Sequence, residues 1–239
     1  GRDLGLPNHL VDRQPFPGPG LAIRLLCATE AFSTPEHSSV AAQLQAECDR
    51  KPELKLYPAL LPVRTVGVQG DGRSYSYLAA LSSSESVDEQ WEALLELARE
   101  IPCHVHQVNR VVFVLGEAIK EAPTQVTRTL LQPEPLEQLR AADAIVTAVL
   151  TRWKGKVVEL AQVPVVLFPV GFGTHAGRSI GIRAFITRDF MTGTPALPGR
   201  DLPLEALREM HSRILAEVPG IVRVALDLTS KPPATTEWE

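Results

Sequence analysis

Long hydrophobic runs and an excess of charge of one sign are both missing from this sequence of 239 residues. The longest apolar run covers residues 163–170 and contains two prolines, so it is too short to span a bilayer. Residues 1–14 have no apolar core of the kind found in a signal peptide. The net charge is −4 without a block of like charges, which gives no support to binding of nucleic acid or of an anionic membrane. We therefore expect neither a nucleic acid nor a membrane among the partners.

Cysteine is also scarce, and its spacing excludes two classes of protein. Cys27, Cys48 and Cys103 are an odd number at wide spacings, which fits neither a disulfide framework nor a tetrahedral metal site. His104 and His106 could place two ligands on one side of a strand, but no further cysteine or nearby carboxylate completes a set. The sequence therefore predicts reduced thiols, no metal site and, from the thiols, a cytoplasmic location.

Proline, in contrast, is plentiful at 20 residues, and it divides the chain into segments that repeat. Residues 57–83 and 162–187 each begin with an apolar run that a proline interrupts, Pro62 or Pro169. In both segments a glycine-rich turn follows, ends in Gly-Arg-Ser and leads into a run of alternating apolar residues. This pattern predicts a strand, a turn and a second strand, twice.

Helical periodicity and a third strand complete each copy of the repeat. The sequence predicts helices over 38–49, 91–101, 135–153 and 203–215, and further strands over 108–116 and 220–229. Arg110 and Arg223 occupy matching places in these last two strands. The predicted fold is α+β, with two tandem α-β-β-α-β units that have antiparallel sheets. Because a three-stranded sheet is poorly buried alone, we expect the units to pack together as an intrachain pseudo-dimer.

The stretch "PFPGPGLAIR", residues 15–24, forces the backbone into an extended and rigid path. Two interpretations remain open. The stretch can be a connector between domains, or its glycine-lined backbone can pass close to a ligand, with Arg24 meeting an anion.

The glycine-rich turn of the first copy, "VGVQGDGRSY" over 66–75, contains Asp71 and Arg73. A tight turn between strands explains the glycines without a ligand. In the second copy Ala176 stands where Asp71 stands in the first, while both copies keep Gly-Arg-Ser. We therefore interpret Gly-Arg-Ser as structural and Asp71 as the candidate functional residue.

The last eleven residues, "TSKPPATTEWE", combine Lys231, two prolines, hydroxyls such as that of Thr236, and Glu237. An ammonium, hydroxyls and a carboxylate on a stiff segment suit a ligand that carries a phosphate and N–H groups. A solvated acidic tail is the alternative, although Trp238 argues against it. The chain has no Gly-x-Ser-x-Gly, Walker or Gly-x-Gly-x-x-Gly motif, so we predict no catalytic residue in it.

Four stretches together resemble one known family. They are "RQPFPGPGLAIR" (13–24), "LPVRTVGVQGDGRSYSY" (61–77), "DFMTG" (189–193) and "LTSKPPATTEWE" (228–239), in this order. They resemble the C-terminal, dimerisation part of the glutamine-hydrolysing GMP synthases over nearly the whole chain. The doubled unit is similar to the long form of these enzymes found in eukaryotes.

The resemblance implies a function for the whole enzyme. Such enzymes are ligases of purine biosynthesis: they release ammonia from glutamine, adenylate XMP with Mg-ATP, and replace the adenylate by ammonia to give GMP. The C-terminal part joins copies or subunits, with a homodimer as one possible assembly, and completes the XMP site. Asp71, Gln162, Lys231 and Glu237 match positions that contact XMP in the family. On this resemblance Lys231 binds the phosphate and Glu237 binds polar groups of the nucleotide, with Arg24, Arg73 and Thr236 as further possible contacts.

The resemblance also implies the domain organisation. Residues 1–25 resemble the end of the ATP-pyrophosphatase domain and its linker, 26–130 the first dimerisation-type subdomain, and 131–239 the second. The glutaminase Cys-His-Glu set and the Ser-Gly-Gly-Val-Asp-Ser loop are not in this sequence. We therefore expect the segment to bind no cofactor itself, to depend on catalytic domains of the same polypeptide, and to be inactive alone. Gln14 stands where the family commonly has histidine, and this departure and Ala176 argue against a second nucleotide site. The alternative is a purely structural assembly module without ligand binding.

Overall fold

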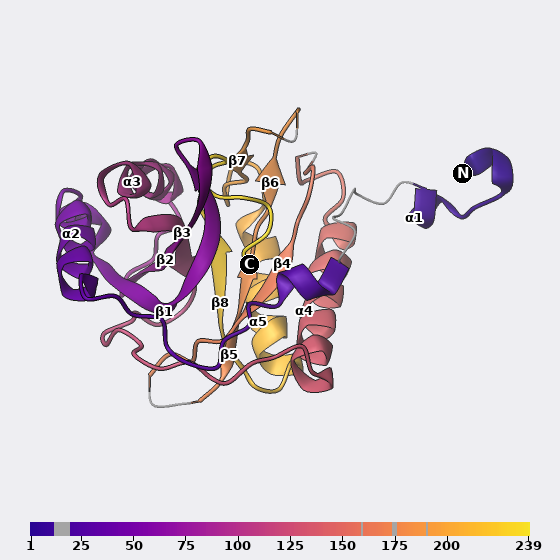
Figure 1. The fold of residues 1–239 in the computed structure, drawn as a ribbon. Coiled ribbons are helices and arrows are strands. Elements are labelled where there is room, and N and C mark those ends of the chain that lie inside the picture. Colours follow the sequence, from indigo (N-terminus) through magenta and orange to yellow (C-terminus); the bar gives the residue numbers. More distant parts are fainter. Residues whose placement is uncertain (12–19, 159, 174–175, 190) are drawn as a thin grey trace.

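Six strands form one large mixed sheet, and long helices cover one of its faces (Figure 1). The computed structural model describes every residue except 12–19, 159, 174–175 and 190. The first half of the proline-rich stretch, residues 15–19, therefore lies outside the described residues.

The elements lie close to their predicted positions. The large sheet consists of β1 (Leu56–Gln69), β2 (Gly72–Ser83), β3 (Val108–Val114), β4 (Val165–Phe168), β5 (Arg178–Ile182) and β8 (Ile221–Asp227). The strands β6 (Phe185–Ile186) and β7 (Thr194–Pro195) form a separate small hairpin. The long helices are α2 (His37–Asp49), α3 (Trp91–His104), α4 (Pro133–Arg152) and α5 (Leu204–Glu217). The short elements are η1 (Arg2–Leu4), α1 (Asn8–Val11), η2 (Gly20–Arg24) and η3 (Pro52–Leu54).

The predicted tandem repeat is confirmed. The first unit runs α2-β1-β2-α3-β3, and the second runs α4-β4-β5-α5-β8 with the β6–β7 hairpin inserted before α5. The strand order β1-β2-β3-β8-β5-β4 joins the units edge to edge through the antiparallel pair β3 and β8. Phe113 pairs with Leu226 at the centre of this junction. Since Arg110 and Arg223 are equivalent, Phe113 and Leu226 are equivalent too, and a pseudo-two-fold axis passes between them.

The expectation of antiparallel sheets needs a correction. β1 with β2 and β4 with β5 are antiparallel hairpins, but β2 with β3 and β5 with β8 are parallel pairs. These pairs are parallel because α3 and α5 each carry the chain back to the end of the sheet from which the preceding strand started. One sheet also runs through both units, so the predicted boundary between residues 130 and 131 stays a prediction.

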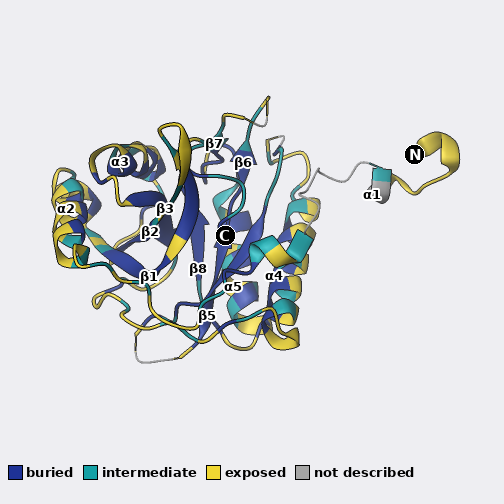
Figure 2. Ribbon diagram, viewed as in Figure 1, coloured by how far each residue is buried: buried dark blue, intermediate teal, exposed yellow. Residues whose placement is uncertain are grey.

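The apolar residues of the strands alternate between two covered faces. In β3, Val111 and Phe113 belong to the core under the helices, while Val112 and Val114 belong to a second core on the opposite face. Buried residues accordingly fill the sheet and the helix sides that face it (Figure 2). In α3 the apolar residues recur every three or four positions, which gives the helix one buried side.

The face opposite the long helices is covered by coil segments. Leu26 donates its backbone N–H to Leu167 of β4 (2.8 Å), and Thr127 donates its backbone N–H to Pro169 (2.8 Å). The third covering segment is the C-terminal tail, whose Trp238 belongs to the core on this face. Among the described residues, every helix is too short or too polar to cross a membrane.

Because one core extends through both units, we expect the chain to unfold in a single cooperative transition. Leu226→Ala should lower the free energy of unfolding by about 2–5 kcal/mol, since it opens a cavity at the junction. Urea denaturation followed by circular dichroism and by tryptophan fluorescence measures both effects. Leu131→Ala, at an exposed position, is the control and should change little. Two separate transitions would contradict the shared core.

Candidate functional site

The C-terminal tail is folded into the molecule. The Trp238 side chain has no exposed surface and stacks on Phe168, with ring centroids 5.8 Å apart. Gly181 of β5 makes the space, because a Cβ atom there would stand 2.6 Å from the Trp238 ring. Of the two interpretations of the tail, the solvated one is therefore excluded for Trp238.

A buried arginine attaches the tail to the sheet. Arg110 of β3 is completely buried and donates hydrogen bonds to the backbone carbonyls of Thr235 (3.1 Å) and Glu237 (2.9 Å). Its other terminal nitrogen donates to the Asp227 carboxylate of β8 (2.6 Å). The guanidinium also lies 4.9 Å from the Trp238 ring centroid, in cation–π geometry. Arg110 thus fixes the backbone on both sides of Thr236.

A second buried arginine shares the same carboxylate. Arg183 donates to Asp227 (2.8 Å) and to the backbone carbonyl of Thr229 (2.9 Å). Burial raises the pKa of Asp227, but the charges of Arg183 and Arg110 outweigh it and leave that pKa below its ordinary value. Burial lowers the pKa of Arg110 to about 10, which still leaves it charged at neutral pH. Two cations against one anion give this cluster a net positive charge beneath the tail.

The β6–β7 hairpin connects two of the predicted site residues. Phe185 of β6 donates its backbone N–H to Gln162 (3.1 Å). Gly193, directly before β7, exchanges backbone hydrogen bonds of 3.0 and 3.1 Å with Lys231. A Cβ atom on Gly193 would stand 2.5 Å from the Ile186 carbonyl oxygen, so only glycine fits this crossing. The half-buried residues Gln162 and Lys231 are therefore linked through one small sheet.

In the stretch "DFMTG" the structure describes Asp189 and residues 191–193, which end at Gly193. The Asp189 carboxylate accepts hydrogen bonds from the backbone N–H groups of Met191 (2.9 Å) and Thr192 (2.8 Å). These bonds, that of Thr192 first, lower the pKa of Asp189 from 3.8 to about 2. The ionised carboxylate thus fixes the loop against which Lys231 pairs.

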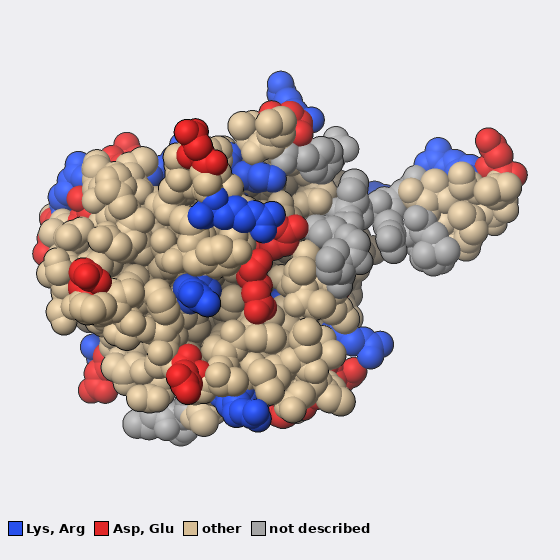
Figure 3. All heavy atoms as spheres, in the orientation of Figure 1, with Lys and Arg blue, Asp and Glu red and all other residues tan. Residues whose placement is uncertain are grey.

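The tail also lies beside the hairpin that carries Asp71. Val68 donates its backbone N–H to Pro233 (2.7 Å), and Val66 donates to Trp238 (2.9 Å). Val68 is the second-last residue before the turn between β1 and β2, and Asp71 is exposed in that turn. Figure 1 shows this hairpin and the tail next to each other, and in Figure 3 basic and acidic residues stand close together on the face with the C-terminal end.

The secondary candidates divide into two groups. Arg73 is exposed and pairs with Val68 in the β1–β2 hairpin, and Thr236 is half-buried in the tail, so both lie with the main candidates. Arg24 has another task, because its guanidinium bonds the Asp143 carboxylate of α4 at 2.6 Å. A contact between Arg24 and a ligand stays a prediction.

Sequence reasoning missed Arg110, Arg183 and Asp227 as a cluster. Each interrupts an apolar stretch that becomes buried, and that interruption was the available signal. The role of these residues depends on hydrogen bonds between side chains that lie 44 and 117 positions apart. The periodicity of the sequence does not identify such partners.

The arrangement can bind and orient a polar ligand. Around the tail the structure provides an ammonium, an amide, carboxylates and a hydroxyl on backbone that hydrogen bonds fix. Within the described part of the chain, no group of three or more His, Cys, Asp or Glu side chains could hold a metal ion. His104 Nδ1 instead lies 2.9 Å from the Glu47 carboxylate, within hydrogen-bond distance.

Two segments, residues 43–122 and 155–238, match the family model of the GMP synthase C terminal domain. Each segment falls within one of the two units, and together they cover more than half of the chain. The chain therefore belongs to the GMP synthase C-terminal domain family.

Its relatives bear the name of one enzyme. The glutamine-hydrolyzing GMP synthase of Dictyostelium discoideum is 43% identical over 274 residues, a match that covers 100% of this chain and 38% of the relative. The probable glutamine-hydrolyzing GMP synthase of Caenorhabditis elegans is 38% identical over 299 residues, covering 100% and 40%. The glutamine-hydrolyzing GMP synthase of Cereibacter sphaeroides is 43% identical over 129 residues, a match that covers only 47% of this chain and 24% of the relative. The chain thus spans about two fifths of the length of the first two relatives.

We expect Arg110→Met to lower the free energy of unfolding by about 3–5 kcal/mol, because it breaks a buried ion pair and removes the donor to the tail carbonyls. The backbone amides of Val66 and Val68, which donate to the tail, should then exchange faster with deuterium. Arg140→Met on the exposed side of α4 is the matched control and should change neither quantity. Unchanged exchange in Arg110→Met would show that the tail does not depend on this residue.

The low pKa of Asp189 predicts a dependence of stability on pH. A depressed carboxyl pKa stabilises the fold above the ordinary value of 3.8, and this contribution is lost as pH falls toward the folded value of about 2. We expect Asp189→Asn to be less stable than the parent chain at pH 5 and to approach it as pH falls from 4 to 2. Urea denaturation across this range measures the difference. A difference that stays constant from pH 5 to 2 would argue against the ionised carboxylate as its source.

Proposed function

We propose that the chain is the C-terminal segment of a glutamine-hydrolysing GMP synthase and that it completes the binding site for XMP. Membership of the family and the names of the relatives support the enzyme class. The observation that carries the binding role is the tail, which Arg110 and the β6–β7 hairpin fix so that Lys231 and Glu237 stand on ordered backbone.

The chemistry of the tail suits a purine nucleotide. The Lys231 ammonium would bind the phosphate through a charge-assisted hydrogen bond. The Glu237 carboxylate would accept hydrogen bonds from N–H groups of the base. Gln162 and Asp71 would complete the polar contacts from the small sheet and the hairpin turn.

The chemical steps belong to other parts of the proposed enzyme. Release of ammonia from glutamine and adenylation of XMP by Mg-ATP would take place on catalytic domains of the same polypeptide. This segment would bind and orient XMP and join copies of the enzyme, with a homodimer as one possible assembly. Its location in the cytoplasm stays a prediction from the cysteines.

A purely structural role is the second candidate. The burial of Trp238 and the edge-to-edge sheet would be needed in an assembly module even without a ligand. The two candidates differ in what Lys231 does, because an assembly module does not require its ammonium.

We expect Lys231→Ala and Glu237→Gln in the full-length protein to raise the KM for XMP about 10- to 100-fold, the loss of a charge-assisted hydrogen bond. Steady-state kinetics should show the KM for ATP and the hydrolysis of glutamine nearly unchanged, and gel filtration an unchanged assembly. Lys154→Ala, an exposed lysine outside the tail, is the control.

An unchanged KM for XMP together with an altered assembly would favour the structural module. The 239-residue chain alone should form no GMP from XMP, ammonia and ATP. Turnover by the purified chain would contradict the division of labour proposed above.

A further inference from the structure

Asp227 accepts hydrogen bonds from two buried arginines, although one of them is enough to balance its charge. Arg110 already supplies a counter-ion at 2.6 Å, so the positive charge of Arg183 is in excess. Besides burial, the charge of Arg183 lowers the pKa of Arg110, because like charges repel. The Nη2 atom of Arg183 is also buried without a partner among the residues that the structure describes. Neutralisation of Asp227 therefore does not explain why an arginine stands in this place.

The first unit has Ser82 in the place that Arg183 has in the second unit. Ser82 directly follows the β2 residue that pairs with Phe113. Arg183 directly follows the β5 residue that pairs with Leu226, the equivalent of Phe113. The Ser82 hydroxyl accepts the backbone N–H of Ile119 (2.8 Å), in the segment that follows β3. A short hydroxyl is thus enough for the fold in this place, and the arginine of the second unit needs another reason.

Arg183 holds the start of the tail and the β6–β7 hairpin together. Its Nη1 atom donates to the backbone carbonyl of Thr229 (2.9 Å), two residues before Lys231. Its guanidinium carbon lies 4.7 Å from the ring centroid of Phe185, in cation–π geometry. That ring packs closely on Gly193, whose backbone exchanges two hydrogen bonds with Lys231. Arg183 therefore supports Lys231 in two ways, through the tail itself and through the hairpin residue with which Lys231 pairs.

The other arginine supports the opposite end of the tail. Arg110 donates to the backbone carbonyl of Glu237 (2.9 Å). Asp227 joins the two guanidinium groups, since both donate to its Oδ2 atom. Arg183 thus supports the end of the tail that begins with Lys231, and Arg110 supports the other end.

We propose that Arg183 is a positioning residue for the phosphate of XMP. It acts without touching the ligand, by holding Lys231 in the place from which its ammonium binds the phosphate. This inference rests on the XMP site proposed above and adds a residue that determines how tightly the phosphate end is bound. Arg183→Lys is the suitable test, because it keeps a positive charge near Asp227. The lysine side chain is shorter, however, and has no planar group to lie on the Phe185 ring.

In the full-length protein, Arg183→Lys should raise the KM for XMP about fivefold and leave kcat and the KM for ATP unchanged, because only binding of the phosphate is weakened. A double-mutant cycle assigns this effect to one group of the tail. In the Lys231→Ala background, Arg183→Lys should change the KM for XMP less than about twofold, because the group that it positions is gone. In the Glu237→Gln background, the change of about fivefold should persist.

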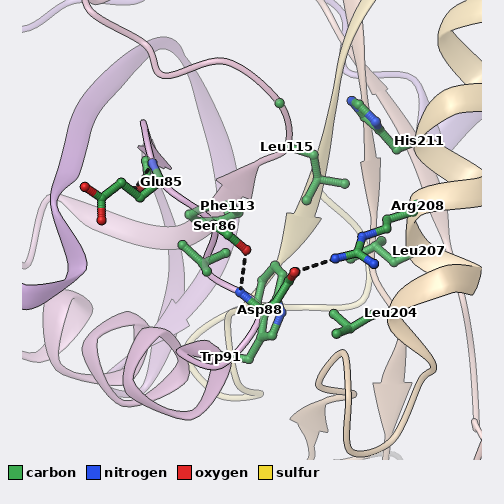
Figure 4. A pocket seen from close by; sticks show the side chains of 13 residues that line it. Glu85, Ser86, Asp88, Trp91, Phe113, Leu115, Leu204, Leu207, Arg208 and His211 are labelled. Carbon is green, nitrogen blue, oxygen red and sulfur yellow. Dashed lines mark hydrogen bonds and ion pairs between the residues drawn. The ribbon is translucent and has the colours of Figure 1, made fainter.

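Two control variants test whether a general loosening of the fold explains the effect. Arg178→Lys changes another buried arginine of the second unit, which donates a hydrogen bond to Thr129 (2.8 Å) instead of the tail. Arg208→Lys changes the ion pair with Asp88 that joins the two units on the side of the helices (Figure 4). Both variants should leave the KM for XMP unchanged. A rise in either control equal to that in Arg183→Lys would overturn the proposal.

Hydrogen exchange gives a second measurement, which needs no ligand. In Arg183→Lys the backbone amides of Gly193 and Lys231 should exchange faster with deuterium, while that of Val66, bonded to Trp238, should not. An unchanged KM for XMP in Arg183→Lys, independent effects of Arg183→Lys and Lys231→Ala, or unchanged exchange at Gly193 and Lys231 would each overturn the positioning role alone. An unchanged KM for XMP in Lys231→Ala would overturn the proposed binding role, and this inference with it.

Discussion

One buried carboxylate connects the parts of this molecule that come from different regions of the sequence. Asp227 sits where β3 meets β8 and accepts hydrogen bonds from Arg110 of the first unit and Arg183 of the second. A buried charge is tolerated only when it is paired, so the three side chains constrain one another. The same Arg110 extends to the carbonyls of the tail. The same buried cluster therefore fixes both the junction of the units and the position of the tail.

The cluster positions the candidate ligand groups indirectly, through the backbone of the tail. Lys231 and Glu237 flank a segment whose backbone is bonded to β1, to Arg110 and to Gly193. An ordered backbone lowers the entropy that ligand binding must otherwise overcome, because the side chains start from nearly the right place. The proposed binding function would thus depend on residues that never need to touch the ligand.

The sequence predicted the elements better than their arrangement. Helices and strands followed from apolar periodicity and from proline and glycine, and Trp238 indicated an ordered tail. The parallel pairs and the join between β3 and β8 depend on contacts between distant residues, which local patterns do not contain. The ion pair of Arg24 with Asp143 was not predictable for the same reason, since the two residues lie 119 positions apart. The fit of Trp238 over Gly181 depends on the absence of a side chain, which a single sequence does not mark as significant.

The pseudo-two-fold axis through Phe113 and Leu226 makes the two units comparable residue by residue. The axis makes Arg110 equivalent to Arg223, and it makes Val114 equivalent to Asp227. Arg223 therefore has no buried carboxylate across the axis and turns instead to the exposed Glu117, 3.5 Å away. One difference between a carboxylate and a methyl-bearing side chain breaks the symmetry of the duplicated fold. After duplication the second copy carries the anchored tail, while the first copy supplies the buried arginine and the strand to which that tail is bonded.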